Sequence, residues 1–117
     1  MPLTSDRALL EAFRRGEEAA LTRVYHAHFD DLLDTLARGL RVRHAGGTSW
    51  LRLAPSDLEA VVQESFARAF SPKTRLAYDG LRPFSGWLLS IARHTALDLA
   101  RRRGVGGEPV PLEEEQA

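Results

Sequence analysis

The chain has 117 residues, no cysteine, and a formal net charge of zero from 16 basic and 16 acidic residues. This length suits one domain with a single core, and the lack of cysteine excludes disulfides and thiolate metal sites and fits a reducing compartment. No apolar run approaches the roughly 18 residues of a membrane span, so we expect a soluble, cytoplasmic protein. Leu, Ala, Arg and Glu outnumber the strand-forming residues, which favours an all-α fold, a compact bundle of about four helices.

The charges are unevenly distributed along the chain. Residues 1–60 hold 8 basic and 9 acidic side chains, residues 61–103 hold 8 and 3, and residues 104–117 hold 0 and 4. The middle segment therefore carries a net charge of 8 − 3 = +5. Because salt screens each exposed charge beyond about 8 to 10 Å, this segment can attract phosphate although the whole chain is neutral.

Two helices are predicted in the first forty residues. Thr4 or Ser5 can cap the first helix, and Gly16 suits its end. Glu17 and Glu18 favour the start of a second, long amphipathic helix, because negative charge is stabilising at a helix N-terminus. Its inward positions recur every three or four residues and are Leu21, Val24, Tyr25, His28, Leu32, Leu36 and Leu40.

A loop and a third helix follow. The segment Arg43–Pro55 is predicted to be a loop, because Gly46, Gly47 and Pro55 interrupt the helical pattern. Ser56 and Glu59 then have the spacing of a capping box, which predicts a helix of about four turns that ends before Pro72. Its inward residues are Leu58, Val61, Val62, Ser65, Phe66 and Ala69, with Phe70 at the margin.

A second loop, a last helix and a tail complete the chain. Two prolines, the Asp79-Gly80 pair and two aromatic residues predict a shaped loop over Ser71–Phe84. Helical spacing of apolar residues then predicts a helix over Phe84–Arg103. Residues 104–117 are rich in Gly, Pro and Glu with little to bury, so we expect a flexible acidic tail after a domain formed by residues 1–103.

No local pattern indicates catalysis, a metal or a cofactor. His26 and His28 are two residues apart, which points them to opposite sides of a helix, and no cysteine can join them. The glycine pairs follow no predicted strand, so they lack the context of a phosphate-binding loop. No serine, histidine and acidic residue have a spacing that would activate a nucleophile. We therefore expect a protein that is not an enzyme and needs no cofactor.

Cations and aromatic rings alternate in the last helix and the loop before it. The cations are Lys73, Arg75, Arg82, Arg93, Arg101, Arg102 and Arg103, and the rings are those of Tyr78, Phe84 and Trp87. This mixture is typical of surfaces that bind single-stranded nucleic acid. The alternative is structural: arginines stabilise a helix C-terminus by about 0.3 to 1 kcal/mol, and the rings belong to the core. One such arginine is easier to explain in this way than three.

Three blocks of the sequence carry a specific resemblance. They are GEEAALTRVYHAHFDDLL (16–33), DLEAVVQESFARAF (57–70) and RPFSGWLLSIARHTALDLARRR (82–103). In that order they closely resemble region 2 of the extracytoplasmic-function (ECF) group of sigma-70-type RNA polymerase sigma factors. The resemblance covers about residues 6 to 103. It implies a helical domain that binds RNA polymerase core and recognises and melts the minus-ten element of promoters.

The resemblance also implies roles for individual residues. The helix with Asp57, Gln63, Glu64 and Arg68 is similar to the segment that binds the clamp helices of the largest polymerase subunit. The loop Ser71–Phe84 resembles the loop that captures a flipped base of the non-template strand, and the last helix resembles the one that reads the upstream edge of the element. The implied DNA-binding residues are Lys73, Arg75, Tyr78, Phe84, Trp87, Ser90, Arg93, His94, Arg101, Arg102 and Arg103.

The sequence departs from the family pattern in three places. His94 stands where the family most often has asparagine in the block IARN, which leaves the base preference open. The connection Arg41–Pro55 is longer than usual and contains Trp50, so it either reaches an additional surface or pads the fold, and we favour padding. The helix-turn-helix domain that reads the minus-thirty-five element has no counterpart in these residues, which fits either an excised domain or a short factor.

Two other functions remain as alternatives. In the first, the same helices form an interaction module that occupies the clamp helices, or is held by an anti-sigma factor, without melting a promoter. In the second, the chain is a helical scaffold with no role at the polymerase. Binding to polymerase core separates the second alternative from the others, and binding to single-stranded promoter DNA separates the first.

Overall fold

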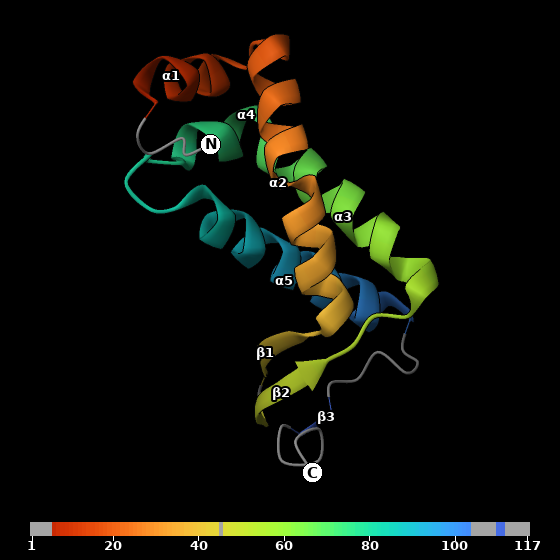
Figure 1. The fold of residues 1–117 in the computed structure, drawn as a ribbon. Coiled ribbons are helices and arrows are strands. Elements are labelled where there is room, and N and C mark those ends of the chain that lie inside the picture. Colours follow the sequence, from red (N-terminus) through yellow and green to blue (C-terminus); the bar gives the residue numbers. More distant parts are fainter. Residues whose placement is uncertain (1–5, 45, 104–109, 112–117) are drawn as a thin grey trace.

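Five helices and three strands make up the part of the chain that the computed structural model describes, residues 6–44, 46–103 and 110–111. The helices are α1 (Arg7–Arg15), α2 (Glu18–Arg38), α3 (Pro55–Phe70), α4 (Pro72–Ala77) and α5 (Phe84–Arg103). The strands are β1 (Leu40–His44), β2 (Gly47–Leu51) and β3 (Val110–Pro111). The helical majority confirms the expected all-α class, to which the sheet is a small addition (Figure 1).

The long helices α2, α3 and α5 pack against one another and form the body of the fold. In Figure 1, the short helices α1 and α4 lie at one end of this body, and the strands lie at the other. Strand β1 continues the chain directly from α2 and contacts α5. One end of α5 therefore lies near α1 and α4, and its later turns lie near the sheet.

One apolar core joins α1, α2, α3, α5 and the hairpin. Its buried members include Leu9, Phe13, Val24, Leu32, Leu36, Leu40, Val42, Leu51, Val61, Val62, Phe66, Ala69, Tyr78, Phe84, Leu88, Ala92 and Ala96. The inward positions predicted for α3 are confirmed at Val61, Val62, Ser65, Phe66 and Ala69. Ser65 is tolerated in the core because its hydroxyl donates to the Val61 carbonyl oxygen at 2.6 Å.

The two ends of helix α1 are set by neighbouring residues in the sequence. The Asp6 carboxylate accepts the Leu9 amide at 3.0 Å, so Asp6 is the N-cap, while Thr4 and Ser5 lie outside the described residues. Gly16 ends the helix with a φ of 78°, as predicted. A side chain at Gly16 would also collide with the Arg75 guanidinium, 2.3 Å from where its Cβ would lie.

The predicted capping box of α3 is wrong. The helix begins at Pro55, its N-cap is Ala54, and no side chain caps it. Proline suits the first helical position because its φ is already helical and its missing N–H would have no partner there. The helix therefore starts one residue before Ser56, which lies in its first turn.

The predicted loop at Arg43–Pro55 is also wrong, because much of it forms a β-hairpin. Strands β1 and β2 pair antiparallel from Leu40 opposite Leu51 to His44 opposite Gly47. Leu40, predicted as the last inward position of the second helix, is instead buried in β1, since α2 ends at Arg38. Alternate residues Leu40 and Val42 are buried while Arg41 and Arg43 are exposed, which is the period of a strand with one face on the core.

The chain passes from α2 into the hairpin at Gly39, which adopts a φ of 105°. The Trp50 indole packs on this glycine, and a Cβ there would lie 2.4 Å from Trp50 Nε1. Both the backbone conformation and the close contact therefore favour glycine. Trp50 holds β2 against the end of α2.

Two further segments differ from their predicted form. The loop expected over Ser71–Phe84 contains the short helix α4, which starts with Pro72. In the expected tail, Val110 and Pro111 form β3 and pair with Trp50 and Ser49 of β2. The prediction of flexibility otherwise falls on residues 104–109 and 112–117, which lie outside the described residues.

Replacement of Phe13 should test the core. Phe13 is fully buried and its ring makes edge-to-face contacts with those of Phe70, Tyr78 and Phe84 at centroid distances of 5.9, 6.4 and 5.5 Å. We expect Phe13→Ala to lower the free energy of unfolding by about 3 to 5 kcal/mol, measured by urea denaturation. Leu81→Ala, at an 84% exposed position, is the control and should change it by less than about 0.5 kcal/mol.

Candidate nucleic-acid and polymerase interface

Three aromatic residues of the candidate DNA surface lie in one cluster at the start of α5. The Tyr78 ring lies 5.4 Å from that of Phe84 and 4.9 Å from that of Trp87, and the Phe84 and Trp87 rings are 5.4 Å apart. Tyr78 is 0% exposed and Phe84 is 3% exposed, whereas Trp87 is partly exposed. The sequence correctly grouped these rings, but the fold divides them between core and surface.

The prediction that bases stack on Tyr78 and Phe84 is therefore wrong. A base can stack only on an exposed ring face, and both rings are covered by Phe13 and by each other. The Tyr78 hydroxyl is also engaged, since it donates to the Arg82 carbonyl oxygen at 2.5 Å. Burial raises the pKa of this hydroxyl, and the nearby Asp79 carboxylate adds to the effect.

The loop between α4 and α5 is held in one shape by Asp79 and Gly80. The Asp79 carboxylate accepts the amides of Leu81 at 2.8 Å and Arg82 at 3.3 Å, and these hydrogen bonds lower its pKa. Gly80 has a φ of 77° and lies against Leu10 of α1. This tight turn leaves the Leu81 side chain exposed at the surface.

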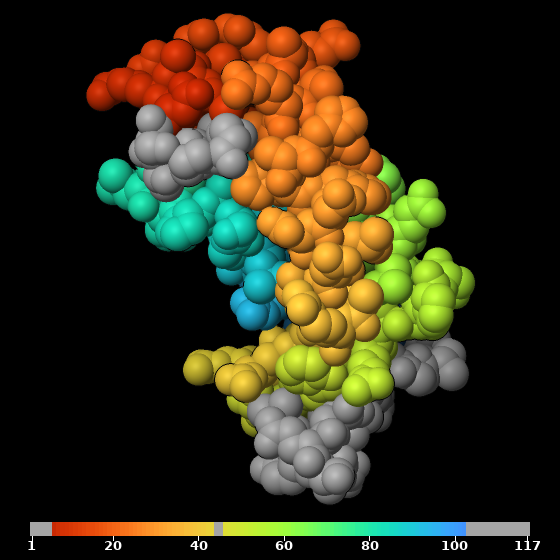
Figure 2. All heavy atoms as spheres, viewed as in Figure 1, coloured from red at the N-terminus to blue at the C-terminus, as the bar shows by residue number. Residues whose placement is uncertain are grey.

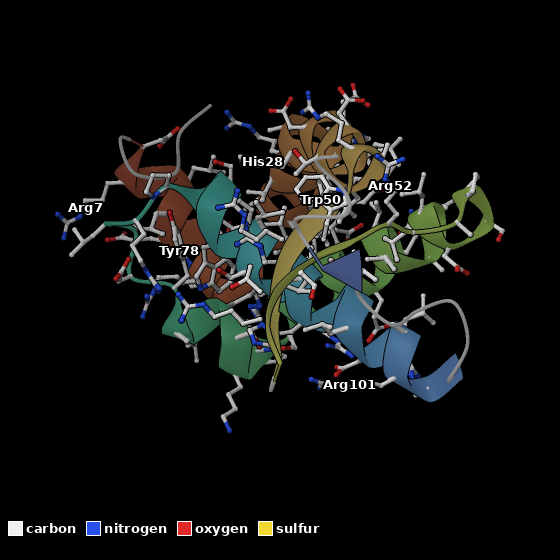
Figure 3. All side chains as sticks on the ribbon, turned by 90° about the horizontal axis from the view of Figure 1, so that it is seen from below. Arg7, His28, Trp50, Arg52, Tyr78 and Arg101 are labelled. Carbon is white, nitrogen blue, oxygen red and sulfur yellow. The ribbon has the colours of Figure 1, made fainter. Side chains whose placement is uncertain are left out.

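The exposed candidate residues of α5 follow one side of the helix. Ser90, His94 and Arg101 are spaced by four and seven residues, which places them in one row, with the partly exposed Trp87 beside it. The His94 ring Nδ1 lies 2.9 Å from the Ser90 carbonyl oxygen, which fixes the ring along the helix. In Figure 3, Tyr78 and Arg101 lie toward opposite ends of α5, so this row spans much of the helix.

Two arginines near the end of α5 are at the surface. Arg101 and Arg102 are exposed, and no ion pair joins either of them to another described residue. The Arg103 side chain lies outside what the structure describes. Arg93 is partly buried, and its Nε atom is enclosed without a hydrogen-bond partner among the described residues.

Lys73 and Arg75 of α4 have different environments. Lys73 is exposed. Arg75 instead donates from Nε to the Phe70 carbonyl oxygen at 2.8 Å and from Nη1 to the Arg14 carbonyl oxygen at 3.2 Å. These carbonyls belong to the last turns of α3 and α1, where backbone acceptors lack helical partners. Arg75 therefore joins two helix ends, a role that the sequence did not predict.

The candidate polymerase-binding residues of α3 differ in exposure. Gln63 and Glu64 are exposed, and the Gln63 amide donates to the Tyr25 hydroxyl of α2 at 3.0 Å. Asp57 is only 8% exposed, so most of its side chain is turned away from a partner on this face. Of these predicted residues, Gln63 and Glu64 are accessible to a partner and Asp57 is largely buried.

Arg68 connects the two candidate surfaces. Its guanidinium contacts Glu64 Oε2 at 3.1 Å on its own helix and Asp98 Oδ2 at 2.9 Å on α5. The hydrogen bond that Arg68 donates to the Asp98 carboxylate is the main reason why the pKa of Arg68 is raised. A shallow cavity of about 480 Å³ lies along this junction, lined by Glu64, Ala67, Arg68, Ser71, Thr74, Ile91 and His94. The α3 and α5 residues therefore form one continuous surface.

His28 lies in a second cavity, between α2 and the start of α5. This cavity of about 220 Å³ is lined by His28, Asp31, Leu32, Thr35, Ser85, Gly86, Leu88 and Leu89. The imidazole Nε2 is buried without a hydrogen-bond partner among the described residues, and its ring lies 4.8 Å from that of Phe84. Burial lowers the pKa of His28, because the charged form loses water.

Sequence reasoning missed Arg41 and Arg43. Both are exposed on β1, and with Arg93 and His94 they line a third cavity beside α5. Their signal was the alternation Leu40-Arg41-Val42-Arg43, which has the period of a strand. That run is short and directly follows a long helical pattern, so the sequence by itself predicts the end of a helix and then a loop there.

Comparisons with models of known protein families, with curated proteins and with solved structures found no match. Within the described residues, no group of three or more His, Asp or Glu side chains could hold a metal ion. Across the same residues, no helix combines the length and apolar character needed to cross a membrane. Chemical interpretation of the surface therefore depends on its own residues and on the resemblance of the three sequence blocks.

Substitution of Lys73 and Arg75 should give opposite results. Arg75→Ala leaves the Phe70 and Arg14 carbonyls without their donor, so we expect the free energy of unfolding to fall by about 1 to 3 kcal/mol. Lys73→Ala removes an exposed side chain and should change stability by less than about 0.5 kcal/mol. Urea denaturation of both variants measures the difference. Equal stability of the two variants would contradict the joining role of Arg75.

The free energy of unfolding should decrease as the pH is lowered, because His28 becomes protonated. Because the pKa of His28 is lower in the folded state, the unfolded chain binds more protons below its ordinary value near 6.5. The stability from a neutral His28 is thus complete above this value and is lost as pH falls toward the lowered pKa. We expect a slope of at most about 1.4 kcal/mol per pH unit in urea denaturation at successive pH values. His28→Leu should flatten the slope, and an unchanged slope would contradict this assignment.

Proposed function

We propose that this chain is the part of a sigma factor, of the extracytoplasmic-function type, that binds RNA polymerase core and the minus-ten element of promoters. The proposal rests on the three sequence blocks and on one structural observation. The exposed face of α3, with Gln63 and Glu64, adjoins the exposed row of α5 through the Arg68 contacts to Glu64 and Asp98. A polymerase element bound on α3 would then lie beside a DNA strand bound along α5.

In this proposal the DNA path runs from the loop before α5 to the arginines at its end. The partly exposed Trp87 offers a ring at the start, His94 follows in the middle, and Arg101 and Arg102 contact phosphates at the end. The chain carries out no covalent chemistry and acts in the cytoplasm with the polymerase. An anti-sigma factor that covers the same two faces is the expected inhibitor.

Energetics indicate that the domain needs polymerase in order to open DNA. A stacked DNA step is worth about 1.4 kcal/mol on average, and extruding one base costs a few kcal/mol. Stacking on one aromatic ring returns only about 1 to 3 kcal/mol. Since Tyr78 and Phe84 are buried, Trp87 alone of the three predicted rings is partly exposed. A bubble of several base pairs therefore requires further contacts from polymerase.

The same burial favours the second candidate function, an interaction module that binds the clamp helices or an anti-sigma factor without melting a promoter. This module would use the α3 face and would not need a row of stacking rings. The two functions share polymerase binding and differ in DNA binding. An experiment on both ligands separates them.

Polymerase binding should depend on the α3 face. We expect Gln63→Ala combined with Glu64→Ala to weaken capture of polymerase core by the immobilised chain at least tenfold, measured by surface plasmon resonance. Both side chains are exposed, so the fold should survive, and circular dichroism checks this. Glu59→Ala, exposed on an earlier turn of α3, is the matched control. Failure of the unmodified chain to bind core would reject both functions.

DNA binding should depend on the end of α5. We expect the chain with polymerase core to bind a single-stranded minus-ten oligonucleotide with an affinity that falls steadily as salt rises, measured by fluorescence anisotropy. Arg101→Ala with Arg102→Ala should reduce the slope of log affinity against log salt by about 1.4, the value for two phosphate contacts on a single strand. Core binding without any effect of the chain on the oligonucleotide would favour the interaction module.

A further inference from the structure

The hairpin and α5 enclose a groove at the end of the molecule away from α1. Its volume is about 580 Å³, and it is lined by Arg41, Val42, Arg43, Thr48, Arg93, His94 and Leu97. Figure 2 shows the surface hollowed between the yellow strand β1 and the blue part of α5. The groove thus combines a strand and a helix that are about fifty residues apart in the sequence.

The register of the hairpin explains why arginines line this groove. Leu40 and Val42 are buried, so the intervening Arg41 and the following Arg43 are turned outward. Thr48 lies directly opposite Arg43 and adds a hydroxyl on the same side of the sheet. Successive outward residues on a strand are about 6.6 Å apart, a spacing comparable to that of neighbouring phosphates on an extended nucleic-acid strand.

The positive charge of the groove is not neutralised by the described residues. No acidic side chain lines it, and no ion pair joins Arg41, Arg43 or Arg93 to a described carboxylate. Residues 40–54 contain three arginines and no acidic residue at all. The enclosed Nε of Arg93 also lacks an acceptor among the described residues. Unpaired guanidinium groups with a neighbouring hydroxyl are suited to phosphate oxygens.

The groove adjoins the candidate DNA path. His94 lines both this groove and the cavity between α3 and α5, so a strand that passes His94 can enter either of them. Trp87, Ser90 and Arg101 lie in the same row of α5. A phosphate backbone that follows this row reaches Arg93 and then the two arginines of β1 without leaving the surface.

We propose that the groove between β1 and α5 binds the phosphate backbone of single-stranded DNA, with Arg41 and Arg43 as contacts additional to those of α5. This inference rests on the proposed function for the identity of the strand. The hairpin then extends the DNA surface, contrary to the expectation that this connection only pads the fold. An acidic peptide has compatible charge, but continuity with the α5 row favours nucleic acid.

Substitution of the two hairpin arginines tests the groove. The full chain is titrated with a labelled single-stranded oligonucleotide of about 12 nucleotides, at salt from about 50 to 200 mM, with fluorescence anisotropy as the measurement. We expect Arg41→Ala with Arg43→Ala to weaken binding about three- to tenfold at low salt and to reduce the salt slope by about 1.4. Both side chains are exposed, so folding should be unaffected, and thermal melting checks this.

Matched variants separate the groove from overall charge. Arg7→Ala with Arg23→Ala removes the same charge from exposed positions on α1 and α2, and Arg7 points outward away from the hairpin in Figure 3. This control should bind nearly as the unmodified chain does. The variant with Arg41→Lys and Arg43→Lys should recover most of the salt slope, because it restores the charge. Equal losses in the hairpin variant and the control would overturn the proposal.

Measuring polymerase-core binding beside DNA binding distinguishes failure of the groove proposal from failure of the proposed function. If the hairpin variant binds DNA unchanged while the α5 variant loses affinity, the groove proposal fails and the proposed function stands. If the chain binds oligonucleotides through Arg41 and Arg43 but does not bind polymerase core, the groove stands and the proposed function fails. Loss of core binding with unchanged DNA binding in the hairpin variant would assign the groove to a protein partner and overturn the proposal.

Discussion

The edge-to-face packing of Phe13 against Phe70, Tyr78 and Phe84 is the contact on which the rest of the structure depends. These four rings come from α1, from the end of α3, from the loop before α5 and from the start of α5. Because such rings attract one another through their edges and faces as well as by burying apolar area, the cluster fixes how these segments meet. The direction in which α5 leaves the cluster then decides where its polar row lies.

The same cluster limits what the surface can do. Aromatic residues that hold the fold together cannot also present a free face to a ligand, so recognition depends on the edge of the cluster, at Trp87, and on polar groups farther along α5. The Asp79 turn and Arg75 complete this end of the molecule by satisfying backbone amides and carbonyls that helix ends leave without partners. The loop before α5 is therefore shaped by the interior beneath it.

At the other end of α5 the surface is dominated by cations. Asp98 is the acidic residue of α5 and is engaged by Arg68, so its charge is balanced where α3 and α5 meet. Arg41 and Arg43 of β1 and Arg101 and Arg102 of α5 have no such partner among the described residues. Although the net charge of the chain is zero, its positive charges are concentrated in one part of the surface. A phosphate-bearing ligand would bind to this cationic part.

The sequence by itself determined the helical class, the positions of α1, α2, α3 and α5, and most inward residues of α3, because helical spacing and Gly16 are local signals. It also identified the segment in which cations and rings occur together. Only the tertiary structure decided that Tyr78 and Phe84 are interior, that Arg75 joins two helix ends, and that Arg41 and Arg43 line one groove with residues of α5. Exposure and the meeting of distant segments depend on how helices pack against one another. A local sequence pattern does not contain that information.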